Sequence, residues 1–178
     1  KHGAFRIDSA MQIAAKPSMM SRAEDENGGA AAMAAPAGFL AGLGPVYGAY
    51  LEAQERLAAD DLEGFVAAAA ALNAALGAVE RAGLAGEALG AWKRASAKLG
   101  VDEAFGSIDH ARERFEAMSE GAIELQRRFG HSGEETWALA HCPMAFDNKG
   151  ADWLQRGERI NNPYFGDAML RCGSVREV

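Results

Sequence analysis

The residues best suited to chemistry in this chain are two short sulfur pairs near its C-terminal end. One pair is Cys142 and Met144, and the other is Met169 and Cys172. On an extended segment, Cys142 and Met144 would point to one side, because side chains alternate along an extended chain. On a helical turn, Met169 and Cys172 would share a face, because side chains three residues apart are neighbours there. The two pairs together would supply two thiolates and two thioethers.

These donors indicate a particular class of metal. Thiolate and thioether sulfurs are soft ligands that suit Cu(I) and Ag(I), whereas zinc sites rarely contain a thioether. His141 could add an imidazole, but on an extended segment it would face away from Cys142. The sequence therefore predicts a Cu(I) or Ag(I) site of Cys142, Met144, Met169 and Cys172, with His141 as a fifth candidate ligand. We expect no metal or other cofactor to be required for folding.

The same sulfurs have a second interpretation. The chain contains two cysteines, which could form a disulfide or remain buried thiols. A Cys142–Cys172 disulfide in an oxidising compartment would fix the tail and contribute roughly 3–4 kcal/mol of stability for a loop of that size. Met144 and Met169 would then be core-filling side chains. A metal ion and a disulfide exclude each other at the same sulfurs, and the spacing alone leaves both open.

Composition and charge narrow the class of protein. The chain has 178 residues, 49% of them hydrophobic, which is enough for one domain with a sizeable core. Its net charge of −7 opposes binding to phosphate backbones, so we expect no nucleic-acid partner. No run approaches the ~20 apolar residues of a transmembrane helix, so we expect no membrane span. Since no nucleophile–base pair is evident, we expect the chain not to be an enzyme.

Apolar residues at helical spacing predict four helices before the sulfur-containing tail. We expect them at residues 46–59, 61–81, 87–99 and 103–129. Asp60 and Asp102 are the expected N-caps of the second and fourth helices. Amphipathic helices with short connections predict a mainly α fold, an antiparallel four-helix bundle.

The segments on either side of these helices differ in character. Residues 1–20 alternate apolar and polar side chains in places, which predicts a short extended segment. Residues 21–45 are rich in glycine, alanine and proline and are interpreted as a flexible linker. Residues 46–178 are expected to form the bundle domain with an irregular C-terminal tail packed on it. Within that tail we expect residues 137–146 to be extended and residues 150–154 to form one helical turn.

The tail motif carries a resemblance to a known family. HCPMAFDNKGADWL, followed by NPYFGDAMLRCG, resembles a bacterial domain of unknown function. That domain is appended to, or encoded beside, periplasmic adaptor (membrane fusion) subunits of heavy-metal efflux pumps of the resistance-nodulation-division class. The resemblance covers about residues 46–178. The start, GAFRIDSAMQIAAKPSMM, is similar to the last strand region of such an adaptor, so residues 1–20 would end its membrane-proximal region.

This resemblance implies a setting and partners. It implies a periplasmic location, a copper or silver context, and contact with an inner-membrane heavy-metal efflux pump and the remaining adaptor domains. The expected function is a metal-binding module that captures Cu(I) or Ag(I) for transfer to the pump or for its regulation. The alternative is a structural or interaction domain that docks on the efflux complex, with Cys142 and Cys172 as a disulfide.

Overall fold

The computed structural model describes residues 33–131 and 135–176. The predicted extended segment at residues 1–20 and the first part of the predicted linker lie outside these residues. Among the helices that are described, none combines the length and the apolar character that a membrane span requires.

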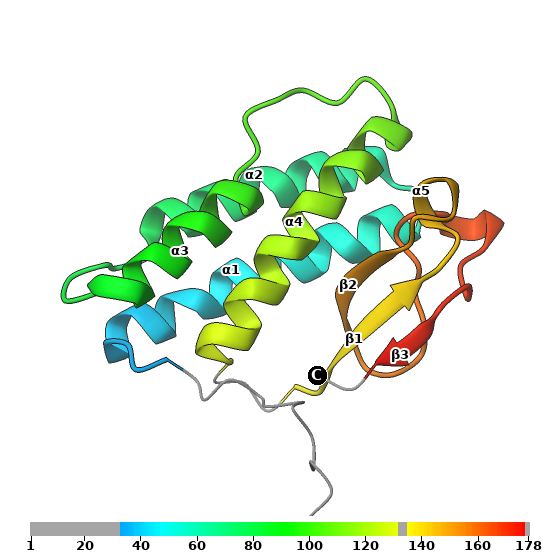
Figure 1. Ribbon diagram of the computed structural model, residues 1–178. Coiled ribbons are helices and arrows are strands. Elements are labelled where there is room, and N and C mark those ends of the chain that lie inside the picture. Colours follow the sequence, from blue (N-terminus) through cyan, green and yellow to red (C-terminus); the bar gives the residue numbers. More distant parts are fainter. Residues whose placement is uncertain (1–32, 132–134, 177–178) are drawn as a thin grey trace, which may run out of the picture.

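Four long helices come first in the described chain, and a small sheet follows them (Figure 1). The helices are α1 (Ala37–Ala58), α2 (Leu62–Ala78), α3 (Gly86–Leu99) and α4 (Ile108–Phe129). Helix α1 packs mainly on α2, α3 packs mainly on α4, and α4 also contacts α1. The prediction of a mainly helical fold is confirmed.

Helix α1 begins earlier than its sequence suggests. It starts at Ala37 rather than at Val46, so the last nine residues of the predicted linker are helical and that boundary was wrong. Pro45 lies inside the helix, where it lacks the N–H that a helical hydrogen bond needs. Phe39 and Leu43 are buried, and they extend the apolar stripe of α1 at helical spacing toward its N-terminus. The glycines and proline in this segment are typical of loops, so the sequence did not indicate that the helix begins here.

The N-caps of α2 and α4 also differ from the predictions. Asp61, not Asp60, caps α2, and its carboxylate accepts the backbone N–H three residues later at 2.8 Å. Ser107, not Asp102, caps α4 in the same way, so α4 has 22 residues instead of about 27. Aspartate and serine are both strong N-cap residues, and the sequence places competing candidates close together. Asp60 instead contacts Arg112 and the Asp167 N–H.

The tail is ordered as a sheet, which corrects the prediction of an irregular tail. Strands β1 (Trp137–Cys142), β2 (Ala151–Arg156) and β3 (Ser174–Arg176) form an antiparallel sheet in the order β2-β1-β3. The predicted helical turn at residues 150–154 is wrong, because β2 pairs with β1 along its whole length. The prediction that the tail packs on the helices is confirmed, since β2 contacts α4 and α1. Two short turns complete this region, α5 (Ala145–Asn148) and η1 (Gly166–Ala168).

Buried hydrogen bonds fix the sheet relative to the helices. The Tyr50 hydroxyl on α1 accepts the Leu154 N–H at 3.1 Å and lies 2.9 Å from the Ser119 hydroxyl on α4. The Tyr164 hydroxyl donates to the Asp152 carbonyl at 3.0 Å. Burial raises the pKa of Tyr50 far above its ordinary value, so this hydroxyl stays neutral. The sheet is therefore held to α1 and α4 by directional contacts as well as by apolar packing.

Candidate dithiol site and the adjoining cavity

The structure brings the two cysteines together beside the ends of β1 and β3. The Sγ atoms of Cys142 and Cys172 lie 3.6 Å apart. Cys142 is the last residue of β1 and is fully buried, whereas Cys172 is partly buried and lies two residues before β3. Both are free thiols in this structure. Two residues far apart in the sequence therefore form one dithiol.

A single buried amide positions Cys172. The Asn162 side-chain N–H donates to the Cys172 carbonyl at 2.8 Å, and its side-chain oxygen accepts the Tyr164 N–H at 2.8 Å. The Cys172 N–H donates to the Met169 carbonyl at 2.9 Å, which closes a tight turn. Asn162 is fully buried, so breaking these bonds would leave buried polar groups without a hydrogen-bond partner, which costs free energy. Asn162 thus determines where the second thiol lies.

Gly173 lets the backbone of β3 approach β1 closely. Its φ is 135°, in the region that favours glycine. A Cβ atom there would lie 2.7 Å from the His141 carbonyl oxygen and 3.2 Å from the Trp153 ring. The glycine therefore allows the residue after Cys172 to pack directly on the strand that carries Cys142.

Contact with Cys142 changes the ionisation of Cys172. The hydrogen bond with Cys142 raises the pKa of Cys172, and burial and the charge interaction with Cys142 act in the same direction. Cys172 therefore holds its proton more firmly than an isolated thiol would. Because the thiolate is the form that binds a metal, any metal must displace the thiol protons, and its binding must tighten as pH rises.

The two methionines lie in different environments. Strand β1 ends at Cys142, so the prediction of an extended segment through residue 146 was wrong beyond that point. Met144 has helical backbone angles in the following turn, and its side chain is 46% exposed. Met169 is partly buried and is joined to Cys172 by the turn described above. The structure thus brings together the two thiols of the predicted set. Met144 and Met169 lie two and three residues from them in the sequence.

His141 faces away from Cys142, as predicted for consecutive residues of a strand. Its Nδ1 lies 2.6 Å from Oδ1 of Asp152, the residue opposite it on β2. An ionised carboxylate can only accept, so Nδ1 carries the hydrogen and Nε2 is left for another partner. Arg176 on β3 lies 3.4 Å from the same Asp152 oxygen. His141 therefore belongs to a second group of side chains, separate from the dithiol.

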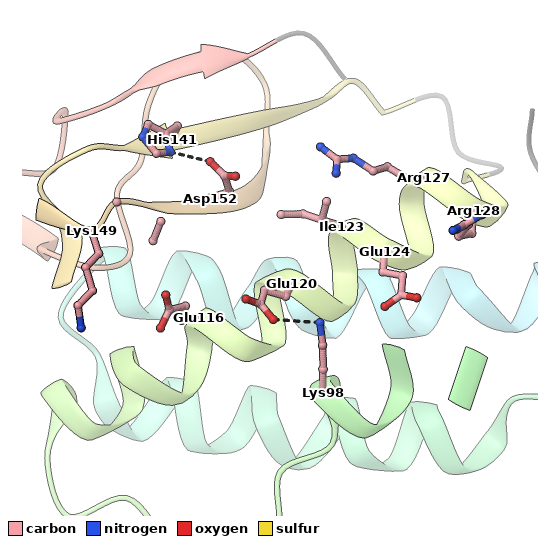
Figure 2. Close-up of a pocket in the computed structure, with 12 residues that line it drawn as sticks. Lys98, Glu116, Glu120, Ile123, Glu124, Arg127, Arg128, His141, Lys149 and Asp152 are labelled. Carbon is pink, nitrogen blue, oxygen red and sulfur yellow. Dashed lines mark hydrogen bonds and ion pairs between the residues drawn. The ribbon is translucent and has the colours of Figure 1, made fainter. Parts of the chain in front are cut away.

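His141 and Asp152 of this group line a cavity of about 550 Å³ (Figure 2). The cavity lies between α4 and the sheet, with one side chain from α3 at its edge. Its lining contains four cationic residues, four anionic residues, His141 and a few small or apolar groups: Lys98, Arg127, Arg128, Lys149, Glu116, Glu120, Glu124, Asp152, Ile123, Gly150 and Ala151. Partial burial and the charge of Glu120 raise the pKa of Glu116. The cavity is thus polar, and its charges balance formally.

The turn at the edge of this cavity has an unusual backbone. Phe146, Asp147 and Asn148 have φ values of 52°, 58° and 65°, and none is glycine. Left-handed helical conformations cost roughly 1–2 kcal/mol for each such residue. The Phe146 ring packs on Tyr164, with centroids 5.3 Å apart, and this contact helps to hold the turn. Strained backbone of this kind concentrates at functional sites, and here it presents the next residue, Lys149, to the cavity.

Geometry alone allows two uses of the dithiol. With metal–sulfur bonds of about 2.3 Å and tetrahedral angles, two thiolates lie about 3.8 Å apart. A disulfide has a sulfur–sulfur distance of about 2.05 Å, so the two atoms would need to approach by about 1.5 Å. Within residues 33–131 and 135–176, no group of three or more His, Cys, Asp or Glu side chains is placed to hold a metal ion. The donors at the dithiol are sulfurs, which favours a soft metal.

Asp152 and Lys149 were not among the predicted site residues. The signal that could have found Asp152 is the short run ADWLQR between Gly150 and Gly157, whose length and flanking glycines suit a strand. Pairing that strand with residues 137–142 places Asp152 opposite His141. Lys149 carried no such signal, because its position depends on the left-handed turn that precedes it.

The fold and the site together define a small, mainly helical domain with a dithiol on a C-terminal antiparallel sheet. The chain belongs to the family described as "Protein of unknown function (DUF3347)", and the match covers residues 46–134. No curated protein and no solved structure matches the chain. The family match runs from α1 through α4 and ends before β1, so both cysteines and His141 lie outside it.

Proposed function

We propose that this chain is a periplasmic metal-binding module of a heavy-metal efflux adaptor. It would capture Cu(I) or Ag(I) on Cys142 and Cys172, for transfer to an inner-membrane pump or for its regulation. The observation that carries the proposal is the 3.6 Å distance between the two sulfurs, which lies close to the spacing of two thiolates on one metal ion. The efflux setting rests on the resemblance of the tail motif to adaptor-associated domains.

The environment of the two sulfurs suits capture and release of a soft ion. Cys142 is fully buried, which keeps water from competing for the metal, while the partly buried Cys172 gives access from the surface. Met144, which is 46% exposed, and Met169 are two and three residues from the cysteines in the sequence, and their neutral thioethers would hold an ion more weakly than thiolates do. His141 has a different partner, so we leave it out of this ligand set.

The helices would serve this site as a rigid support. We describe α1–α4 as an antiparallel four-helix bundle, with the sheet fixed to it through Tyr50 and Ser119. The dithiol sits on the sheet next to β3, which is short and exposed. Metal binding would join residues beside β1 and β3, so that occupancy of the site changes how firmly β3 is held. A pump or adaptor surface could sense that change.

A disulfide between the same residues is the second candidate, and the short sulfur–sulfur distance also favours it. The chain would then be a structural or interaction domain that docks on the efflux complex. Its tail would be fixed by a covalent bond, and the methionines would have no ligand role.

An anaerobic titration of the reduced protein with Cu(I), against a competing chelator, tests the metal proposal. We expect one tightly bound ion, loss of binding in Cys142→Ser, and weaker binding in Met169→Leu. His141→Gln is the matched control, because this residue is adjacent to Cys142 but faces the other side of β1. Absence of tight binding, or tight binding that survives Cys142→Ser, contradicts the proposal.

The mass of the protein purified without reductant separates the two candidates. A mass about 2 Da below that of the reduced protein indicates loss of two hydrogens and a Cys142–Cys172 disulfide. An unchanged mass together with one bound Cu(I) supports the metal-binding function.

A further inference from the structure

The two cysteines of the dithiol differ in how easily a molecule in solution can reach them. Cys142 is 0% exposed and ends β1, which lies between β2 and β3 in the sheet (Figure 1). Cys172 is only partly buried and lies two residues before β3, an edge strand whose three residues are all exposed. A reagent that approaches from solution therefore meets Cys172 first.

The chain around Cys172 is also the more easily opened of the two. Strand β3 pairs with β1 over three residues, whereas β2 pairs with β1 over six, up to and including Cys142. Segments with few contacts open locally at the lowest cost in free energy. An opening of β3 would therefore expose Cys172 further, while β2 continues to hold Cys142 in place.

The distance between the two sulfurs suits a reaction in two steps. The Sγ atoms lie 3.6 Å apart, so a group attached to the Cys172 sulfur would be within reach of the Cys142 thiol. Exchange between a thiol and a disulfide proceeds by attack of a thiolate on one sulfur of the disulfide, through a mixed disulfide. The structure thus pairs an accessible thiol that can form a mixed disulfide with a buried thiol that can resolve it.

We propose that this dithiol undergoes exchange with small disulfides, with Cys172 as the attacking residue and Cys142 as the resolving one. The Cys172 thiol loses its proton to water, and its sulfur bonds to one sulfur of the small disulfide. The bond between that molecule's two sulfurs breaks, and the leaving thiolate takes up a proton. The Cys142 thiol then loses its proton, bonds to the Cys172 sulfur and displaces the second small thiolate, which is also protonated.

The reaction balances without a metal ion or any further reagent. One small disulfide is reduced to two thiols, and the two cysteines are oxidised to one disulfide. The exchange itself does not rest on the metal-binding function. Its product would lack both thiolates, so release of Cu(I) on oxidation is a consequence that does rest on that function.

Mass spectrometry of the reduced chain mixed with oxidised glutathione at pH 8 tests the proposal, because the chain contains only these two cysteines. We expect Cys142→Ala to accumulate one glutathionyl group on Cys172. The matched variant Cys172→Ala should react more slowly by about tenfold or more, because its remaining thiol is fully buried. The parent chain should form the internal disulfide and release two molecules of reduced glutathione.

The same reactions in concentrated urea are the control, because both thiols are accessible in the unfolded chain. The two variants should then react at similar rates, and circular dichroism checks that each is folded without urea. Acid quenching of the parent at early times, followed by peptide mapping, should place the glutathionyl group on Cys172, and this measurement needs no substitution.

Two results would overturn the proposal. Equal rates for the two folded variants, or an early adduct on Cys142 of the parent, would contradict the order of attack. A parent chain that keeps its glutathionyl group and forms no internal disulfide would contradict the resolving role of Cys142. Neither result affects the Cu(I) titration, so this proposal and the metal-binding function can fail separately.

Discussion

The helices and the sheet of this molecule are stabilised in different ways. The helical region has an apolar core of aromatic and aliphatic side chains, such as Phe39, Phe65 and Phe115, all fully buried. The tail shares this core through Trp153 and Leu154, and it relies in addition on two buried amides, Gln155 and Asn162, that bond to the backbone of its loops. Apolar packing in the helical region is not directional, whereas each buried amide of the tail must meet particular hydrogen-bond partners.

Gln155 shows how far the tail depends on single residues. Its side-chain oxygen accepts from the Trp153 indole N–H and the Asn161 N–H, both at 3.0 Å. Its side-chain nitrogen donates to the carbonyls of Gly157 and Arg159, at 3.0 and 2.9 Å. One side chain thus holds both the end of β2 and the loop that follows it. The candidate dithiol stands on this polar framework, so its geometry depends on hydrogen bonds as well as on apolar packing.

The largest expected effect is in the helical core. Phe115 is fully buried and stacks on Tyr50, with ring centroids 5.2 Å apart. Phe115→Ala should lower the free energy of unfolding by about 3–5 kcal/mol, because it leaves a cavity in the core. Urea denaturation measures the change. Val66→Ala on exposed α2 surface is the control and should stay within about 0.5 kcal/mol of the parent. Equal effects of the two changes would show that the apolar core is not the main support.

Oxidation of the dithiol should have the next largest effect, and it should act on the tail. Closing the loop between Cys142 and Cys172 should raise the free energy of unfolding by about 3–4 kcal/mol. Hydrogen exchange should slow most at β3 and at the Cys172 turn. The double variant Cys142→Ser, Cys172→Ser should show no difference between oxidising and reducing buffers. A uniform slowing over α2 and α3 would contradict the separation between the two regions.

Replacing the Gln155 amide should open the tail before the helices. Gln155→Leu is expected to cost about 2–3 kcal/mol, because buried N–H and carbonyl groups lose their partners. Amides of β1 and β2 should then exchange faster, while those of α2 and α3 keep their protection. Glu158→Ala, an exposed neighbour, serves as the control. Loss of protection over the whole chain at once would show that the tail and the helices unfold as one unit.

The smallest expected effect is at a surface contact between the two regions. Asp60 accepts the Asp167 N–H at 2.9 Å and pairs with Arg112, and these contacts lower the pKa of Asp60 below its ordinary value. Because the folded-state pKa is the lower one, this stabilisation is present above about pH 4 and is lost as pH falls through the folded-state value. The carboxylate is partly exposed, so Asp60→Asn should cost less than about 1 kcal/mol near neutral pH.

The loss in Asp60→Asn should disappear in acid, where the parent carboxylate is also neutral. Urea denaturation at several pH values measures this. Asparagine tolerates the positive φ of 56° at this position, so the change tests the charge and not the backbone. A difference that persists at low pH would assign the effect to geometry instead.

The sequence predicted the helices well and the tail poorly, for a physical reason. Four helices were expected from apolar spacing, and the described part of the chain has four long ones, although Phe39 and Leu43 of α1 stand among glycines and Pro45. Helical spacing repeats over many residues, so an error at one position changes only a boundary. The tail depends on single polar residues such as Gln155, whose four partners have no periodic signal. The strands β2 and β3 were therefore missed, whereas β1 lies within the segment that was predicted to be extended.

The candidate site was predicted in part for the same reason. The opposite directions of His141 and Cys142 follow from strand geometry and were expected. The approach of Cys172 to Cys142 depends on Asn162 and could only be left open. Met144 was expected to share a face with Cys142, but the strand ends one residue before Pro143, so the alternation stops there. Whether either methionine binds a metal stays a prediction.

The alternation of β1 ties together two surfaces that could otherwise vary independently. His141 and Cys142 are consecutive, so no residue can be inserted between the charged cavity and the dithiol without reversing the direction of one of them. Insertion or loss of one residue earlier in β1 would exchange the two side chains, placing an imidazole in the core and a thiol in the cavity. A shift of register in β1 therefore alters both surfaces at once. A substitution of His141 or of Cys142 alters only the surface that this side chain faces.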